Sequence, residues 1–151
     1  MRDGKYVVAH VDDSLLAREM VREALEAVGF EVHNAEHAQD FEQRLMADEH
    51  LRQIVDFIVL DMEMPDLTGA QVGGVMDTVY EELENVPFMI YSGKDKLWVE
   101  TMALEVAEYS RGFQRNYRGY MGKSPEGADK LAARVKEILA ELETKNEEGV
   151  E

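Results

Sequence analysis

The chain has 151 residues, no cysteine, and 32 acidic against 16 basic residues, which gives a formal net charge of -16. This length fits one domain with one sizeable core. The charge argues against nucleic acid or an anionic membrane surface as the main partner, and the lack of cysteine excludes disulfides and thiolate metal sites. Because no signal-peptide pattern follows Met1 and no apolar run approaches the ~20 residues of a membrane span, we expect a soluble, cytoplasmic protein.

Short apolar runs alternate with helical patterns along the chain. The apolar runs have the length and composition of buried strands. They are Lys5–Val11, Phe30–Asn34, Ile54–Leu60, Val86–Tyr91 and Gly119–Met121. Between and after them, helical spacing of apolar residues predicts amphipathic helices. These are Ser14–Val28, His37–Arg52, Ala70–Glu84, Lys94–Ser110 and a last helix from Ser124. The alternation predicts an α/β domain with a parallel sheet and helices on both faces.

No repeat or linker divides the chain, so we expect one domain over residues 1–143 and a solvated acidic tail over 144–151. Residues 93–118 form a long connection before the fifth strand. Its end, 112–118, is basic and aromatic and lacks periodicity. Two interpretations stay open for it: an ordinary loop with packed aromatic side chains, or a partner-binding patch that includes Phe113 and Arg115.

Polar side chains follow four of the predicted strands. Asp12 and Asp13 follow the first, Asp61 the third, Ser92 the fourth and Lys123 the fifth. Because the carboxyl ends of parallel strands meet at one edge of a sheet, these groups should lie together, although Asp61 alone could equally cap a helix. Three clustered carboxylates oppose one another's ionisation unless a cation neutralises them, and oxygen ligands favour Mg²⁺. The four histidines lack metal-ligand spacing and are interpreted as structural or surface residues.

A carboxylate can also act as the nucleophile that accepts a phosphoryl group, and a metal, a lysine and a hydroxyl are suited to hold the phosphoryl oxygens. With these residues the chain resembles the receiver domain of two-component response regulators, of the chemotaxis-regulator type. The matching motifs are Val11–Ser14, Asp61–Gly69, Ser92-Gly93 and Tyr120–Lys123. The resemblance covers the chain apart from its tail and implies a flavodoxin-like, doubly wound sheet with strand order 2-1-3-4-5.

The resemblance also implies a role for each site residue. Asp61 would be the phosphoacceptor, while Ser92 and Lys123 would hold the phosphoryl oxygens. Tyr120 would change rotamer together with Ser92, so that phosphorylation alters a protein-binding surface. The Mg²⁺ ligands would be Asp12 through water, Asp13, Asp61 and the backbone carbonyl of Glu63.

The implied protein is a stand-alone response regulator. It would accept a phosphoryl group from a histidine kinase or phosphotransfer protein and signal through contacts with a downstream protein. Nucleic acid and membrane are not expected as partners, and the oligomeric state is open. Beyond Mg²⁺-dependent self-phosphorylation and autodephosphorylation, it would not be an enzyme.

Two alternative functions remain open. A pseudo-receiver that is never phosphorylated would follow if Ser124, in the place of the proline that the family joins by a cis bond, misplaced Lys123. A phosphohydrolase of the haloacid-dehalogenase type would use Glu63, two residues after its nucleophile. That family expects a threonine or valine where Met64-Pro65 stand and does not need the Asp12-Asp13 pair.

Overall fold

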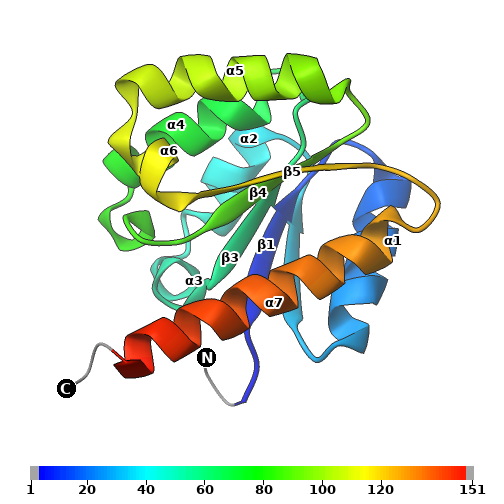
Figure 1. Cartoon of the computed structure of the whole chain (residues 1–151), viewed down its shortest axis with the longest axis vertical. Coiled ribbons are helices and arrows are strands. Elements are labelled where there is room, and N and C mark those ends of the chain that lie inside the picture. The colour runs from blue at the N-terminus through cyan, green and yellow to red at the C-terminus, as the bar shows by residue number, and fades with distance from the viewer. Residues whose placement is uncertain (1–3, 149–151) are drawn as a thin grey trace.

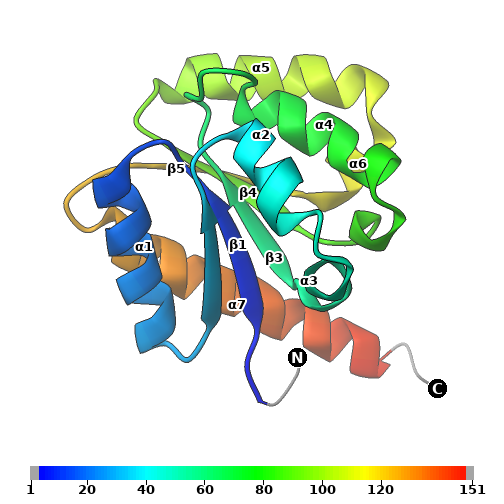
Figure 2. The same cartoon turned by 180° about the vertical axis from the view of Figure 1, so that it is seen from behind.

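The computed structural model describes residues 4–148 and shows one five-stranded sheet in the order β2-β1-β3-β4-β5. The strands are β1 (Val7–Val11), β2 (Glu31–Ala35), β3 (Phe57–Leu60), β4 (Phe88–Ser92) and β5 (Tyr117–Gly122). All four pairings are parallel. Helices cover both faces of the sheet (Figures 1 and 2). The predicted flavodoxin-like fold and its strand order are confirmed.

Each face of the sheet has its own layer of helices. On one face lie α1 (Leu15–Ala27) and α7 (Gly127–Glu148), which pack against each other (Figure 1). The other face carries α2 (Ala38–Asp40), the π-helix η1 (Phe41–Leu45), α3 (Glu49–Ile54), α4 (Gly69–Val79), the 3-10 helix η2 (Glu81–Leu83), α5 (Lys96–Tyr109) and α6 (Arg111–Asn116). The sheet therefore separates two hydrophobic cores.

Strand β1 shows why the strands were recognisable in the sequence. Val7, Ala9 and Val11 point into the core under α2–α6, and Val8 points into the core under α1 and α7. A strand covered on both faces needs apolar residues at nearly every position, because either face is removed from water. His10 is the exception, and it is also fully buried.

The prediction of one helix over His37–Arg52 is wrong. The segment forms α2, a π-helical turn and α3 instead. The carboxylate of Asp48 accepts a hydrogen bond from the N–H of Leu51 and so begins α3 as a new helix. The predicted helix Ala70–Glu84 is also shorter, since α4 ends at Val79 and a 3-10 turn follows.

The segment expected to lack periodic structure contains a short helix, α6. Ser110 begins it by accepting the N–H of Phe113 (3.1 Å), and its hydroxyl donates to the carbonyl of Gly74 in α4 (2.8 Å). Phe113 is only 1% exposed and stacks on Tyr117 with ring centroids 4.7 Å apart. Arg115 donates to the carbonyl of Glu84. Of the two open interpretations, the structure favours packed aromatic side chains, because Phe113 belongs to the core.

Helix α7 differs from its predicted bounds at both ends. It begins at Gly127 rather than at Ser124, which lies in the preceding turn. It continues to Glu148, beyond the expected end of the domain at residue 143. The division into a domain over 1–143 and a tail over 144–151 stays a prediction, and residues 149–151 lie outside the described residues.

Gly69 lets the first turn of α4 pack against the end of β3. A Cβ atom at this position would lie 2.5 Å from the carbonyl oxygen of Asp61 and 3.2 Å from the Cβ of Leu60. We expect Gly69→Ala to lower the free energy of unfolding by about 1–3 kcal/mol in urea denaturation, because backbone must move. Gly93→Ala is the control, since a Cβ there meets nothing within 4 Å. Equal losses of stability in both variants would contradict this role of Gly69.

Candidate functional site

Three carboxylates meet at the carboxyl edge of the sheet. The N–H of Asp61 donates to the carbonyl of Val11 (2.9 Å), which extends the β1–β3 ladder past the last strand residue and places Asp61 beside Asp12. Carboxylate oxygens of Asp12, Asp13 and Asp61 lie within 4.8 Å of one another. Asp12 is fully buried and Asp61 is 2% exposed, whereas Asp13 is exposed. The cluster is therefore open to solvent on one side only.

Lys123 reaches this cluster from the end of β5. Its N–H donates to the carbonyl of Ser92 (2.9 Å), so the ladder between β4 and β5 fixes its backbone. Its amino group lies 2.8 Å from Oδ2 of Asp12 and 3.7 Å from Oδ2 of Asp61. The peptide bond to Ser124 is trans, and no cis bond occurs within residues 4–148. Ser124 therefore does not displace Lys123, which was the premise of the pseudo-receiver alternative.

The loop residues around Asp12 hold it in place. Its Oδ1 accepts the N–H of Ser14 (2.9 Å), and its carbonyl accepts a hydrogen bond from Arg18 in the first turns of α1 (2.7 Å). On the same face of β1, His10 places its Nε2 3.6 Å from Oδ2 of Asp12. Sequence reasoning interpreted His10 as a structural or surface residue and did not connect it with the site. Residues two apart in a strand share a face, and this spacing from Asp12 was the signal that could have linked the two side chains.

Burial and neighbouring charge separate the two buried carboxyls. Burial, followed by the charge of Asp12, raises the pKa of Asp61 to about 7, and Lys123 opposes this only in part. Burial also acts to raise the pKa of Asp12, but its contacts with His10 and Lys123 hold that pKa below the usual value. Near neutral pH without a cation, the pair is therefore poised to keep one proton, on Asp61.

The donor set fits a hard divalent cation. All three clustered side chains offer oxygen, and the buried Oδ1 of Asp61 has no hydrogen-bond partner in the structure. Oxygen ligands beside open solvent suit Mg²⁺, which keeps part of its water shell. Within residues 4–148, no other group of three or more acidic or histidine side chains converges in this way. The side chain of Glu63 is directed elsewhere, to an ion pair with Lys94 (3.5 Å).

Ser92 and Tyr120 lie where β4 and β5 end. Ser92 is fully buried, and its hydroxyl accepts the N–H of Lys94 (3.2 Å). The hydroxyl of Tyr120 donates to the carbonyl of Lys94 (2.7 Å) and lies 3.4 Å from that of Ser92. Tyr120 is thereby joined to the loop that follows Ser92, so a shift of this loop would also act on the tyrosine.

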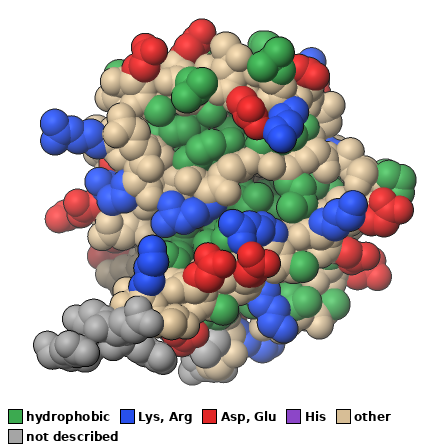
Figure 3. All heavy atoms as spheres, viewed as in Figure 1, with side chains coloured by type: hydrophobic (Ala, Val, Ile, Leu, Met, Phe, Trp, Pro, Cys, Tyr) green, Lys and Arg blue, Asp and Glu red, His purple; other side chains and the backbone are tan. Residues whose placement is uncertain are grey.

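Tyr120 also lines an apolar groove of about 340 Å³ between α5, α6 and β5. Other lining side chains are Ala103, Leu104, Ala107, Phe113 and Tyr117. Figure 3 shows hydrophobic side chains gathered in this hollow below α5. The groove thus extends from the edge of the polar site onto an accessible face.

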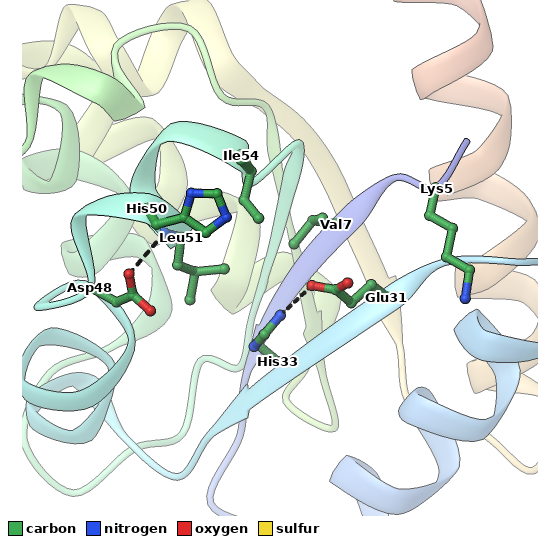
Figure 4. A pocket seen from close by; sticks show the side chains of 8 residues that line it. All are labelled: Lys5, Val7, Glu31, His33, Asp48, His50, Leu51 and Ile54. Carbon is green, nitrogen blue, oxygen red and sulfur yellow. Dashed lines mark hydrogen bonds and ion pairs between the residues drawn. The ribbon is translucent and has the colours of Figure 1, made fainter. Parts of the chain in front are cut away.

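A second hollow, of about 470 Å³, lies at the other end of β1 and β2. Figure 4 shows His33 and Glu31 projecting from β2 toward each other, with Nε2 and Oε2 2.7 Å apart, while His50 comes from α3. Asp48 is engaged in capping α3. These groups do not form a metal cluster among the described residues, so the hollow adds nothing to the polar site.

The family model for the response regulator receiver domain matches residues 8–111. This range is more than half of the chain and contains Asp12, Asp13, Asp61 and Ser92. The chain belongs to this family. Receiver domains accept phosphoryl groups in two-component signalling. No curated protein matches the chain. Lys123 and Tyr120 lie beyond the matched range, so their placement rests on the structure.

Solved receiver domains share the fold at low sequence identity. A CheY-like receiver domain protein of Methanospirillum hungatei has a TM-score of 0.72 at 18% identity, over 94% of this chain and 99% of that one. Chemotaxis protein CheY4 of Vibrio cholerae gives 0.69 at 19%, over 89% and 98%. TrrA of Thermotoga maritima, solved in complex with Mg²⁺ and BeF, gives 0.65 at 20%, over 87% and 97%. At these identities the likeness establishes the fold alone.

Within residues 4–148, no helix combines the length and the hydropathy needed to cross a membrane.

The raised pKa of Asp61 predicts that the metal-free protein loses stability as pH rises. The native state keeps the proton up to about pH 7, whereas the unfolded chain releases it near the ordinary value of 3.8, so this contribution is lost between those values. In EDTA, Asp61→Asn should be more stable than wild type at pH 8 by on the order of 2 kcal/mol, and by much less at pH 5. Urea denaturation at both pH values tests this.

The exposed Asp13→Asn is the matched control, since it makes the same change in net charge without relieving a buried carboxylate. If Asp61→Asn gave the same difference from wild type at both pH values, burial of the charge would not be what raises the pKa.

Proposed function

We propose that Asp61 accepts a phosphoryl group in a Mg²⁺-dependent reaction and that the protein signals through phosphorylation-dependent protein contacts. The convergence of Lys123 and the three carboxylates is the observation that carries this proposal. The phosphoryl donor would be a histidine kinase or a phosphotransfer protein. Mg²⁺-dependent self-phosphorylation and autodephosphorylation are the only chemistry that we assign to the domain.

Asp61 acts as the nucleophile. One of its carboxylate oxygens forms a bond to phosphorus while the bond between phosphorus and the donor's imidazole nitrogen breaks, and that nitrogen recovers the electron pair. The carboxylate must be ionised for this step. Lys123 favours the ionised form of Asp61 and lies close enough to contact the phosphoryl oxygens. Ser92 offers its hydroxyl from the neighbouring strand end.

Asp12, Asp13, Asp61 and the backbone carbonyl of Glu63 would hold the magnesium ion. When bound, the ion neutralises the clustered carboxylates and the charge on the phosphoryl oxygens. Asp13 is exposed, which leaves room for water ligands on its side. The solved complex of TrrA with Mg²⁺ and BeF supports this assignment by analogy of fold.

The donor protein would dock on α1. Leu15 and Leu16 are 61% and 66% exposed and Met20 is 38% exposed, although all three are large and apolar. They lie in the first turns of α1, which begins soon after Asp12 and Asp13, so a protein bound there would be near the phosphoacceptor. An apolar patch at this position fits a helical partner that must bring an imidazole to Asp61.

The downstream target would bind the groove between α5, α6 and β5. Its wall contains Tyr120, whose hydroxyl is bonded to the loop after Ser92. When Ser92 turns toward a phosphoryl group, this loop and the tyrosine would shift together, and the groove would change shape. Phosphorylation at a polar site is in this way linked to an apolar binding surface.

Phosphorylation of Asp61 is tested by mass spectrometry. Wild-type protein with Mg²⁺ and acetyl phosphate should gain one phosphoryl group, and EDTA or Asp61→Asn should abolish the gain. Asp56→Asn is a matched control, since Asp56 precedes the same strand at its opposite end. The same adduct in Asp61→Asn would overturn the assignment, and turnover of added phosphate esters would instead indicate a phosphohydrolase.

The ion pair of Glu63 with Lys94 joins the loops that follow Asp61 and Ser92. Both side chains are about half exposed, at 54% and 46%. Glu63→Ala frees these loops, which should ease access of water to the phosphoryl group and speed dephosphorylation by about threefold, the effect of a weak surface pair. Loss of label from the phosphorylated protein measures the rate. Lys94→Ala should act in the same direction, and unchanged rates in both would dismiss the effect.

A further inference from the structure

His10 is a fully buried polar side chain that the proposed reaction does not use. Both of its ring nitrogens are buried and lack a hydrogen-bond partner in the structure. A buried polar group without a partner is costly, and native proteins contain few of them. Val8, two residues earlier on the same face of β1, packs in the apolar core under α1 and α7. The chain therefore carries a polar ring where a hydrophobic one would be expected to fit.

One acceptor lies close to that ring. Nε2 of His10 is 3.6 Å from Oδ2 of Asp12, slightly too far for a hydrogen bond. The same oxygen is approached at 2.8 Å by the amino group of Lys123. Oδ1 of Asp12 is already bonded to the N–H of Ser14. Lys123 and His10 can thus both donate to this one buried oxygen, and in this structure the lysine makes the closer contact.

Lys123 would have a second group of acceptor oxygens beside it once Asp61 carries a phosphoryl group. Lys123 is 26% exposed, and its flexible stem already brings the amino group within 3.7 Å of Asp61. If it moves toward the phosphoryl oxygens, Oδ2 of Asp12 loses its closest donor. A nearby donor on the protein would then offset the loss.

We propose that His10 is a positioning residue that donates from Nε2 to Oδ2 of Asp12 when Lys123 turns to the phosphoryl group on Asp61. This inference rests on the proposed function. His10 keeps Asp12 oriented as a metal ligand in the phosphorylated state, whereas in the resting state Lys123 makes the closer contact with Oδ2 of Asp12. The movement required is small, because the two atoms are 3.6 Å apart before it occurs.

A matched pair of variants tests the proposal. His10→Gln places an amide N–H near the position of Nε2, and His10→Met has nearly the same length and shape without a donor. Beryllium fluoride is added with saturating Mg²⁺ as an analogue of the phosphoryl group. Its binding is followed by the fluorescence of Trp98, the single tryptophan, whose ring centre lies 5.9 Å from the amino group of Lys94 in the loop after Ser92. We expect His10→Met to bind beryllium fluoride about tenfold more weakly than wild type, the size expected for a hydrogen bond to a charged group.

His10→Gln should restore the affinity for beryllium fluoride to within about twofold of wild type. The affinity for Mg²⁺ alone should change little in both variants, because Lys123 holds Asp12 in the resting state. A merely structural role would lower the stability of both variants without this difference between the two ligands. If His10→Met binds beryllium fluoride as tightly as wild type, the inference is wrong although the proposed function stands. If wild type does not bind it, the proposed function fails first.

A measurement on wild-type protein keeps the inference testable should the variants not fold. In ¹⁵N-labelled protein, the Nε2–H proton of His10 should move downfield and exchange more slowly when Mg²⁺ and beryllium fluoride are added. A signal that stays at its resting position after Trp98 reports binding would overturn the proposed hydrogen bond.

Discussion

The side-by-side burial of Asp12 and Asp61 is the constraint on which the site depends. Two carboxylates at the ends of adjacent strands lose water and repel each other, so each needs compensation. Asp12 receives it from Lys123 and from the N–H of Ser14, while Asp61 receives less and has the higher pKa. This difference matters, because the acid that is less well compensated is the one that gains most from a bound cation or from conversion to the acyl phosphate of the proposed reaction.

The long connection between β4 and β5 is built into the fold rather than left as a surface loop. Helix α6 packs on α4 through Ser110, which donates to the carbonyl of Gly74, and through Arg115, which pairs with Asp77 (3.5 Å). The close fit of the two helices needs Gly112, where a Cβ would collide with the carboxylate of Asp77. The added helix forms a wall of the groove that Tyr120 also lines. This long connection thus shapes the groove that borders Tyr120.

The sequence was informative where one physical requirement acts alone. Strands buried on both faces must be apolar throughout, so their runs and the polar residues after them were recognisable, and the meeting of Asp12, Asp61, Ser92 and Lys123 follows from parallel strands. The region His37–Arg52 was predicted incorrectly because the cap at Asp48 outweighed the helical spacing. Helix α6 has too few residues for periodicity to show. His10 was overlooked because its meaning depends on the carboxylate two residues later.

In the proposed switch, the hydrogen-bond donors of the site exchange one acceptor for another. In the resting structure Lys123 holds Asp12, Tyr120 is bonded to the loop after Ser92, and His10 has no hydrogen-bond partner. Under the proposed function, a phosphoryl group on Asp61 would draw Lys123 and Ser92 toward itself, and the groups they leave would need other partners. Under the proposed switch, the place of the lysine at Oδ2 of Asp12 has a replacement in His10, whose Nε2 lies 3.6 Å away. One covalent change decides most readily between two states when they differ by little free energy.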